Sequence, residues 1–138
     1  MTTEKNMELI RRAYTTLEGG GDLEASVELL TENFIVNLPG LPEPVYGREV
    51  WKLGAQAMLD GFPDLQIDIE DMFAAGDKVA VRVGFRGTHR GQFQGVPATQ
   101  RAVSFRSIEL YRMEGDKIAE EWVSPDMFGL MQQISEPA

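Results

Sequence analysis

The spacing of apolar residues changes at Pro63, and this change constrains the fold more than any other feature of the sequence. Before Pro63, apolar residues recur at helical spacing, as at Met7, Ile10 and Tyr14. After Pro63, apolar and polar residues alternate, which is typical of half-buried antiparallel strands. The sequence therefore predicts an α+β fold in which helices come first and a mostly antiparallel sheet follows.

Turn and cap residues set the expected boundaries of the elements. A first helix ends at Gly19-Gly20-Gly21, and Asp22 is a candidate N-cap for a short second helix. A third helix is expected over residues 48–62, after a short strand over 34–38. A meander of four strands follows, beginning at residues 65, 79, 102 and 117. The length of 138 residues suits one domain, over residues 1–138.

Composition excludes several classes of function. The chain has no cysteine and a single histidine, His89, so thiolate chemistry and multi-histidine metal sites are not expected within one chain. A net charge of −9 argues against nucleic acid and anionic membrane as partners. No apolar run reaches the length of a membrane span, and the charged N-terminal segment does not resemble a signal peptide. We therefore expect a cytoplasmic protein without a metal site.

The last predicted strand ends in a carboxylate among large apolar residues. Trp122, Ser124 and Asp126 share a parity, so an extended chain points all three to one face. With Trp122 buried, Asp126 would lie at the end of an apolar wall. A partly buried carboxylate of this kind is a candidate general base. The alternative is a solvated aspartate at the end of a strand.

The turn at Gly115-Asp116 predicts the register of the final hairpin. If it is a two-residue turn, Glu109 lies opposite Trp122, and Phe105 lies opposite Asp126. These four residues would share a pocket-lining face, with Glu109 and Asp126 about 13 Å apart. That separation does not suit a carboxylate pair unless a bulge shifts the register.

The same register assigns the opposite face of the hairpin. Ile108, Leu110 and Val123 would lie there and give enough apolar surface for a subunit interface. Glu121 would also point outward. We therefore expect a homodimer or homotetramer that uses this outer face.

Several segments, taken in order, make the chain recognisable. They are Phe62-Pro63-Asp64-Leu65, Gly76-Asp77-Lys78-Val79-Ala80, the glycine-rich stretch 87–97, and Trp122-x-x-x-Asp126-x-x-Gly129. With them, the chain resembles the SnoaL-like polyketide cyclases, within the nuclear-transport-factor-2-like superfamily of cone-shaped α+β folds.

The resemblance implies three helices packed on a curved sheet around an apolar cavity. It also implies that an aspartate at the position of Asp126 is the acid/base group in an intramolecular aldol closure of an aromatic polyketide ester. Such a reaction needs no metal and no cofactor. One departure is Glu121, where many relatives have histidine. Because Glu121 is expected to face outward, we expect this departure to leave the chemistry unaffected.

Seven further residues are candidates for contact with a small hydrophobic, aromatic substrate, and some also have a purely structural interpretation. Tyr14 lies on the apolar stripe of the first helix, Asn37 alternates away from the apolar residues of its strand, and His89 could bond the following loop. The candidates are Tyr14, Asn37, Trp51, His89, Phe105, Glu109 and Trp122.

The sequence is also compatible with other functions, because proteins of one fold can have several different activities. A non-catalytic protein that binds small molecules could use the same cavity. An isomerase or an epoxide hydrolase is a further alternative. An epoxide hydrolase would need an arginine between two aspartates, and the expected register puts Arg82, Arg86, Arg106 and Arg112 on the face opposite Asp126. We therefore favour the cofactor-independent acid/base enzyme.

Overall fold

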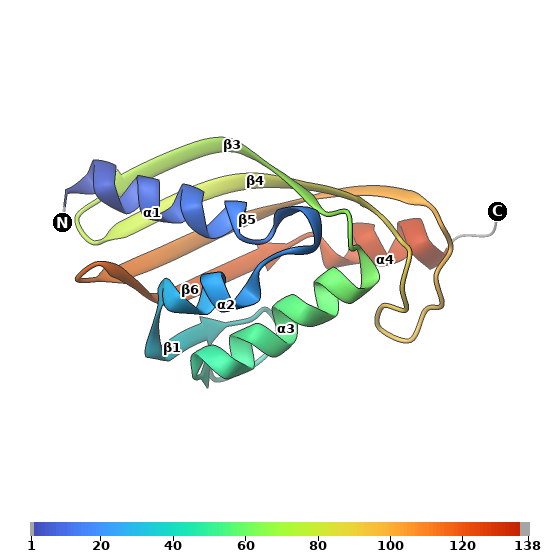
Figure 1. Ribbon diagram of the computed structural model, residues 1–138, viewed down its shortest axis with the longest axis horizontal. Helices are drawn as coiled ribbons and strands as arrows, with labels where there is room; N and C mark the ends of the chain where they lie inside the picture. Colours follow the sequence, from blue (N-terminus) through green and yellow to red (C-terminus); the bar gives the residue numbers. More distant parts are fainter. Residues whose placement is uncertain (1, 136–138) are drawn as a thin grey trace.

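The computed structural model describes residues 2–135 and contains one mixed sheet covered by helices (Figure 1). Its elements are α1 (Thr3–Thr15), a short 3-10 turn η1 (Glu18–Gly20), α2 (Leu23–Glu28), β1 (Leu30–Asn37), β2 (Val45–Tyr46), α3 (Arg48–Gly61), β3 (Gln66–Ala75), β4 (Lys78–Thr88), β5 (Ala102–Glu114), β6 (Lys117–Pro125) and α4 (Met127–Ser135). The strand order is β2-β1-β6-β5-β4-β3. Only the β1–β6 pair is parallel within residues 2–135. The predicted α+β class is confirmed.

Helices α1, α2 and α3 form where the sequence predicts them, because their local signals agree with the fold, whereas α4 was not predicted. The Thr2 hydroxyl accepts a hydrogen bond of 3.1 Å from the backbone N–H of Lys5, and Asp22 caps α2 at Ala25 with the same length. The inner side of α1 buries Leu9 and Ile10. Helices α1, α2 and α3 lie along one face of the sheet, whereas α4 lies beside β5 (Figure 1).

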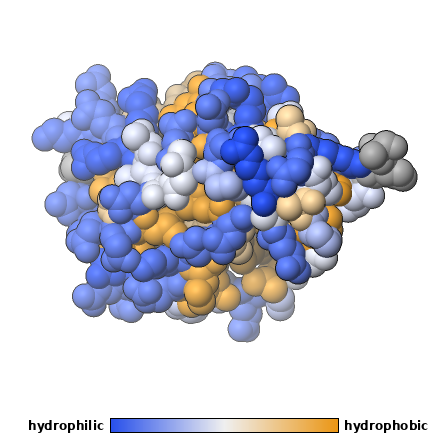
Figure 2. Space-filling model, turned by 45° about the vertical axis from the view of Figure 1, so that its right-hand side comes forward, coloured by the Kyte–Doolittle hydropathy of each residue, from blue (hydrophilic) through white to orange (hydrophobic). Residues whose placement is uncertain are grey.

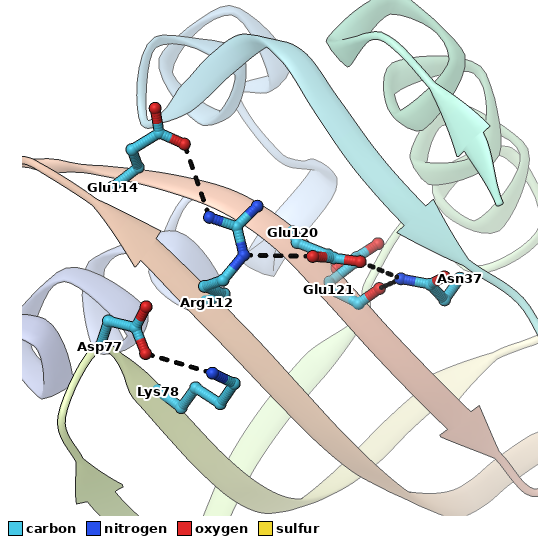
Figure 3. A network of polar contacts seen from close by, with 7 residues as sticks. All are labelled: Asn37, Asp77, Lys78, Arg112, Glu114, Glu120 and Glu121. Carbon is cyan, nitrogen blue, oxygen red and sulfur yellow. Dashed lines mark hydrogen bonds and ion pairs between the residues drawn. The ribbon is translucent and has the colours of Figure 1, made fainter.

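Strand β5 separates the two faces of the sheet most clearly. Every second residue from Val103 to Met113 is buried against the helices. The residues between them face outward, where arginines form ion pairs with carboxylates of the same strand or of neighbouring strands. Arg112, for example, donates to Glu120 at 3.1 Å and to Glu114 at 3.5 Å (Figure 3). The other outward pairs are Arg82–Asp71, Arg86–Asp68 and Arg106–Glu70.

A bulge in β6 overturns the predicted register of the final hairpin. The first pairs follow the turn as expected, with Glu114 opposite Lys117 and Met113 opposite Ile118. Ala119 is then an extra residue, so that Arg112 pairs with Glu120 and the register moves by one. Because side chains alternate along a strand, the shift exchanges the two faces of β6.

The exchange of faces corrects three expectations. Glu109 lies opposite Val123, and Trp122 lies opposite Leu110 on the outer side. Val123 lines the cavity instead of contributing to an outer interface. Glu121 points inward and is buried, although it was expected to point outward.

Two of the recognisable segments contact each other through Asp64 and Thr88. The Asp64 carboxylate accepts hydrogen bonds of 2.7 Å from both the backbone N–H and the hydroxyl of Thr88. These bonds lower the pKa of Asp64, because they stabilise its ionised form. The contact ties the loop after α3 to the end of β4.

Candidate active site

A cavity of about 290 Å³ lies between the helices and the inner face of the sheet. Apolar side chains from α1, α3 and five strands make up most of its wall, among them Phe34, Trp51, Met58, Phe85 and Phe105. On the face shown in Figure 2, apolar residues reach the surface in a recessed area bordered by hydrophilic ones. A cavity of this kind suits a small hydrophobic ligand.

The polar groups of the wall gather around Glu109 on β5. One carboxylate oxygen of Glu109, Oε1, accepts a hydrogen bond of 2.6 Å from Tyr14 on α1 and one of 2.7 Å from Tyr111. The other oxygen accepts from Ser107 at 2.9 Å. The two tyrosine hydroxyls are also 2.8 Å apart. Glu109 is therefore a buried carboxylate that three hydroxyl groups stabilise.

Glu121 on β6 is a second buried carboxyl group in the same wall. It pairs with Tyr111 across the strands, and only 7% of its surface is exposed. Its backbone carbonyl accepts a hydrogen bond from Asn37 (Figure 3), but its carboxyl oxygens form no hydrogen bond within residues 2–135. A ligand in the cavity could be the missing partner of this group.

Burial and repulsion give this cluster unusual proton affinities. Desolvation first, and then the charge of Glu109, raise the pKa of Glu121 well above its ordinary value. The same two causes raise the pKa of Tyr14 and of Tyr111, so both phenols stay protonated. No lysine, arginine or histidine of the described part of the chain lines the cavity. Glu121 can thus hold a proton at a pH at which a solvated carboxyl group has already released it.

Four predicted contact residues line the cavity. Tyr14, Trp51, Phe105 and Glu109 all line it, and for Phe105 and Glu109 this is the face that the alternation of β5 indicated. Their proposed roles in binding remain predictions. Phe105 stacks on Phe85, which also lines the cavity, with ring centroids 5.0 Å apart.

Asn37, His89 and Trp122 lie outside the cavity wall. The side-chain amide of Asn37 donates 3.0 Å hydrogen bonds to the Glu120 carboxylate and to the Glu121 backbone (Figure 3). Trp122 belongs to the outer face because of the bulge at Ala119.

His89 is a core residue, and it bonds the following loop instead of lining the cavity. It is fully buried, its ring lies 5.5 Å from that of Phe62, and its Nδ1 accepts a hydrogen bond of 3.2 Å from the backbone N–H of Thr99. This acceptor role places the ring proton on Nε2. The histidine therefore anchors the 91–100 loop.

Asp126 is exposed and caps α4. Its Oδ1 accepts a hydrogen bond of 2.9 Å from the Gly129 backbone N–H, which makes Asp126 the N-cap of that helix. A Cβ atom at position 129 would overlap this carboxylate, which explains the Asp126-x-x-Gly129 spacing structurally. The expected apolar surroundings are absent, since Trp122 faces outward and Phe128 is 79% exposed. The predicted role of Asp126 as a base remains a prediction.

Sequence reasoning missed Tyr111 and Glu121 as cavity residues. Tyr111 shares the parity of Glu109 on β5, so a longer view of that strand would have found it. For Glu121 the signal was its difference from the histidine of many relatives, but the unpredicted bulge at Ala119 concealed its orientation.

Neither a metal-ligand cluster nor a membrane-spanning helix is found among the described residues. Within residues 2–135, no group of three potential metal ligands lies together. In the same part of the chain, no helix combines the length and apolar character needed to cross a bilayer.

Comparison with known proteins identifies related folds. The family model for the SnoaL-like polyketide cyclase matches residues 8–134. A provisionally assigned SnoaL-like polyketide cyclase from Jannaschia sp. CCS1 superposes with a TM-score of 0.90 at 25% identity, covering 99% of this chain and 95% of that one. No functionally curated sequence matches.

Two Streptomyces proteins are also similar. IdmH from Streptomyces antibioticus, provisionally assigned as a polyketide cyclase, has a TM-score of 0.82 at 30% identity, with 95% of this chain and 99% of that one covered. AclR from Streptomyces galilaeus, provisionally assigned as a hydroxylase, has a TM-score of 0.87 at 25% identity, with 99% and 85% covered. The similarity thus extends over nearly the whole chain and includes more than one assigned activity.

Proposed function

Because the chain belongs to the SnoaL-like polyketide cyclase family, we propose that it is a cofactor-independent acid/base enzyme that closes a ring in an aromatic polyketide or a related hydrophobic carbonyl compound. The observation that carries this proposal is the apolar cavity with a single polar cluster, around Glu109 and Glu121. The apolar wall suits the carbon skeleton of such a ligand, and the cluster suits its carbonyl group.

The proposed reaction is an intramolecular aldol addition. A base removes a proton from a carbon between carbonyl groups, and the resulting enolate carbon bonds to a second carbonyl carbon of the same molecule. The electron pair of that C=O bond moves to its oxygen, which then takes up the proton. Substrate and product are isomers, so no oxidant, reductant or second substrate is required.

Two residues compete for the role of the base. The resemblance assigns it to Asp126, and the neighbours Pro125 and Met127 line the cavity, which puts Asp126 at its edge. However, the Asp126 carboxylate is exposed and already caps α4. Geometry therefore favours a carboxyl group of the cavity, with Asp126 as the second candidate.

A turnover assay tests the proposed reaction. The protein is incubated with an aromatic polyketide methyl ester, and ring closure is followed by chromatography with mass detection, which separates isomers of equal mass. We expect closure above the protein-free rate, with and without a chelator. Saturable binding of the ester without closure above that background would instead favour a non-catalytic binding protein.

The cavity supports an isomerase better than an epoxide hydrolase. An isomerase would use the same acid/base group to move a proton between two carbons. The arginine that an epoxide hydrolase needs is absent from the cavity wall as described, because the arginines of β4 and β5 form their ion pairs on the outer face.

The proposal also includes a setting for the enzyme. We place it in the cytoplasm as a homodimer or homotetramer. Ile108, which is 56% exposed, and Leu110 lie on the outer face of the sheet as predicted, and Trp122 takes the place of Val123 beside them as the core of the proposed subunit interface.

A further inference from the structure

We propose that Glu121 is the catalytic acid/base residue of the cavity, which takes the proton from the acidic carbon of the ligand and returns it to the carbonyl oxygen. The reaction itself rests on the proposed function, whereas the binding of a carbonyl group by Glu121 does not.

The first argument is geometric. Glu121 lines the cavity, is nine-tenths buried, and its carboxyl oxygens form no hydrogen bond within residues 2–135. A buried polar group without a partner is costly, and a ligand that bonds to it removes the cost. The neighbouring Glu109 differs in this respect, because three hydroxyl groups already occupy its oxygens. Of the two carboxyl groups in the cavity wall, Glu121 is the one that is free to contact a ligand.

The second argument concerns the different protonation of these two carboxyl groups. The hydrogen bonds from Tyr14, Tyr111 and Ser107 stabilise a charge on Glu109. That charge opposes a second one on Glu121, so Glu121 binds a proton more tightly than a solvated carboxyl group does. A carboxyl group with a raised proton affinity is a stronger base when ionised, and it is a hydrogen-bond donor when neutral.

Glu121 alone can both accept and return the proton that the reaction transfers. Its ionised form accepts the proton from the acidic carbon, the new C–C bond forms, and its neutral form protonates the alkoxide. Glu121 ends each turnover ionised, as it began. No other titratable group has to exchange a proton with solvent.

One experiment measures binding and turnover across pH in the wild type and in Glu121→Gln. The binding probe is a hydrophobic aryl ketone, 2-acetylnaphthalene, whose oxygen can only accept a hydrogen bond. In the wild type, ketone affinity should fall as Glu121 ionises, and kcat/KM for the polyketide ester should rise over the same pH interval. In Glu121→Gln, ketone affinity should persist without that pH dependence, because the amide remains a donor, and turnover should fall about 10²–10⁴-fold.

Two control variants separate catalysis from structure. Glu120→Gln changes the adjacent carboxylate, which faces outward and bonds to Arg112 and Asn37, so it should keep the wild-type profiles. Glu109→Gln removes the charge beside Glu121, so the interval in which ketone affinity falls should move to lower pH.

The outcomes distinguish this inference from the proposed function. Ring closure by the wild type together with undiminished closure by Glu121→Gln would overturn the inference and leave the proposed function standing. Absence of closure by the wild type would overturn the proposed function, and with it the catalytic role of Glu121, but not the binding of a carbonyl group by Glu121. In that case, ketone binding whose pH dependence is lost in Glu121→Gln would still support Glu121 as the contact residue, and identical pH profiles in both proteins would refute it.

Discussion

The Tyr14 hydroxyl on α1 donates a hydrogen bond of 2.6 Å to the Glu109 carboxylate on β5, 95 residues later in the sequence. This bond links the first helix to the centre of the sheet at the polar end of the cavity. Hydrogen bonds to a buried charge are stronger than those between neutral groups, because the alternative is an unpaired charge in an apolar environment. The bond therefore couples the stability of the fold to the geometry of the site.

Removal of this hydroxyl should destabilise the protein measurably. Tyr14→Phe leaves Glu109 with two of its three donors, so we expect the free energy of unfolding to fall by about 1.5–3 kcal/mol in urea titrations. Tyr46→Phe is the matched control, because Tyr46 is 62% exposed, and it should change little. Equal stability of the two variants would mean that the Tyr14 bond does not stabilise the buried charge.

Two variants of Asp126 distinguish its structural role as the N-cap of α4 from its predicted role as a general base. Asparagine caps helices nearly as well as aspartate, so Asp126→Asn should keep the wild-type melting temperature, whereas Asp126→Ala should lose about 1 kcal/mol. The exposed position predicts unchanged turnover in Asp126→Asn. A fall of about 10²–10⁴-fold without loss of stability would instead assign the general base to Asp126.

The sequence predicts the fold class and most elements because local signals agree with the tertiary structure. The Asp22 cap and the two-residue alternation of β3, β4 and β5 specify their elements without distant contacts. Helix α4 was not predicted, although Asp126 and Gly129 carry its N-terminal signal. The parallel pairing of β1 with β6 joins segments distant in the sequence, and no local pattern specifies it.

The site was harder to predict because one residue changes its register. The hairpin turn gave the correct pairing as far as Met113 and Ile118, and the bulge at Ala119 then reversed every later side chain of β6. Ala119 is buried, but nothing in an alternating strand distinguishes an extra alanine from a regular one. Residues on β5, such as Glu109, were placed correctly because no bulge interrupts their strand.

The outer face of the sheet should mediate self-association. We expect light scattering at micromolar concentration to report a dimer or tetramer, and Ile108→Glu to shift it toward the monomer, because a charge would have to be desolvated in the interface. Val123→Ala is an informative comparison, since Val123 faces the cavity and should not affect association. A wild-type monomer at that concentration would refute this expectation.

Turnover should not depend on a divalent ion. The chain has one histidine and no cysteine, and the proposed proton transfers need only carboxyl groups. We expect the rate of ring closure to be the same before and after dialysis against EDTA. A loss of activity that added Zn²⁺ or Mg²⁺ restores would contradict the cofactor-free mechanism.

The raised pKa of Glu121 predicts how its removal changes stability with pH. In the unfolded chain this group ionises with a pKa of about 4.3, and in the folded protein it ionises at higher pH. Between these two values the folded state holds a proton that the unfolded state has released. The contribution of Glu121 to stability is therefore fully present below the unfolded pKa, and it is lost as pH rises through the folded pKa.

Glutamine at position 121 cannot ionise. The stability of Glu121→Gln relative to the wild type should therefore increase as pH rises. We expect the difference in free energy of unfolding, variant minus wild type, to increase by up to about 1.4 kcal/mol per pH unit within that interval and to be constant below and above it. Urea titrations from pH 4 to 9 measure this difference. Glu120→Gln is the control: it loses an ion pair to Arg112, so its stability relative to the wild type should not increase as pH rises. A pH-independent difference for Glu121→Gln would mean that Glu121 is solvated in the folded protein and is not the buried acid/base group.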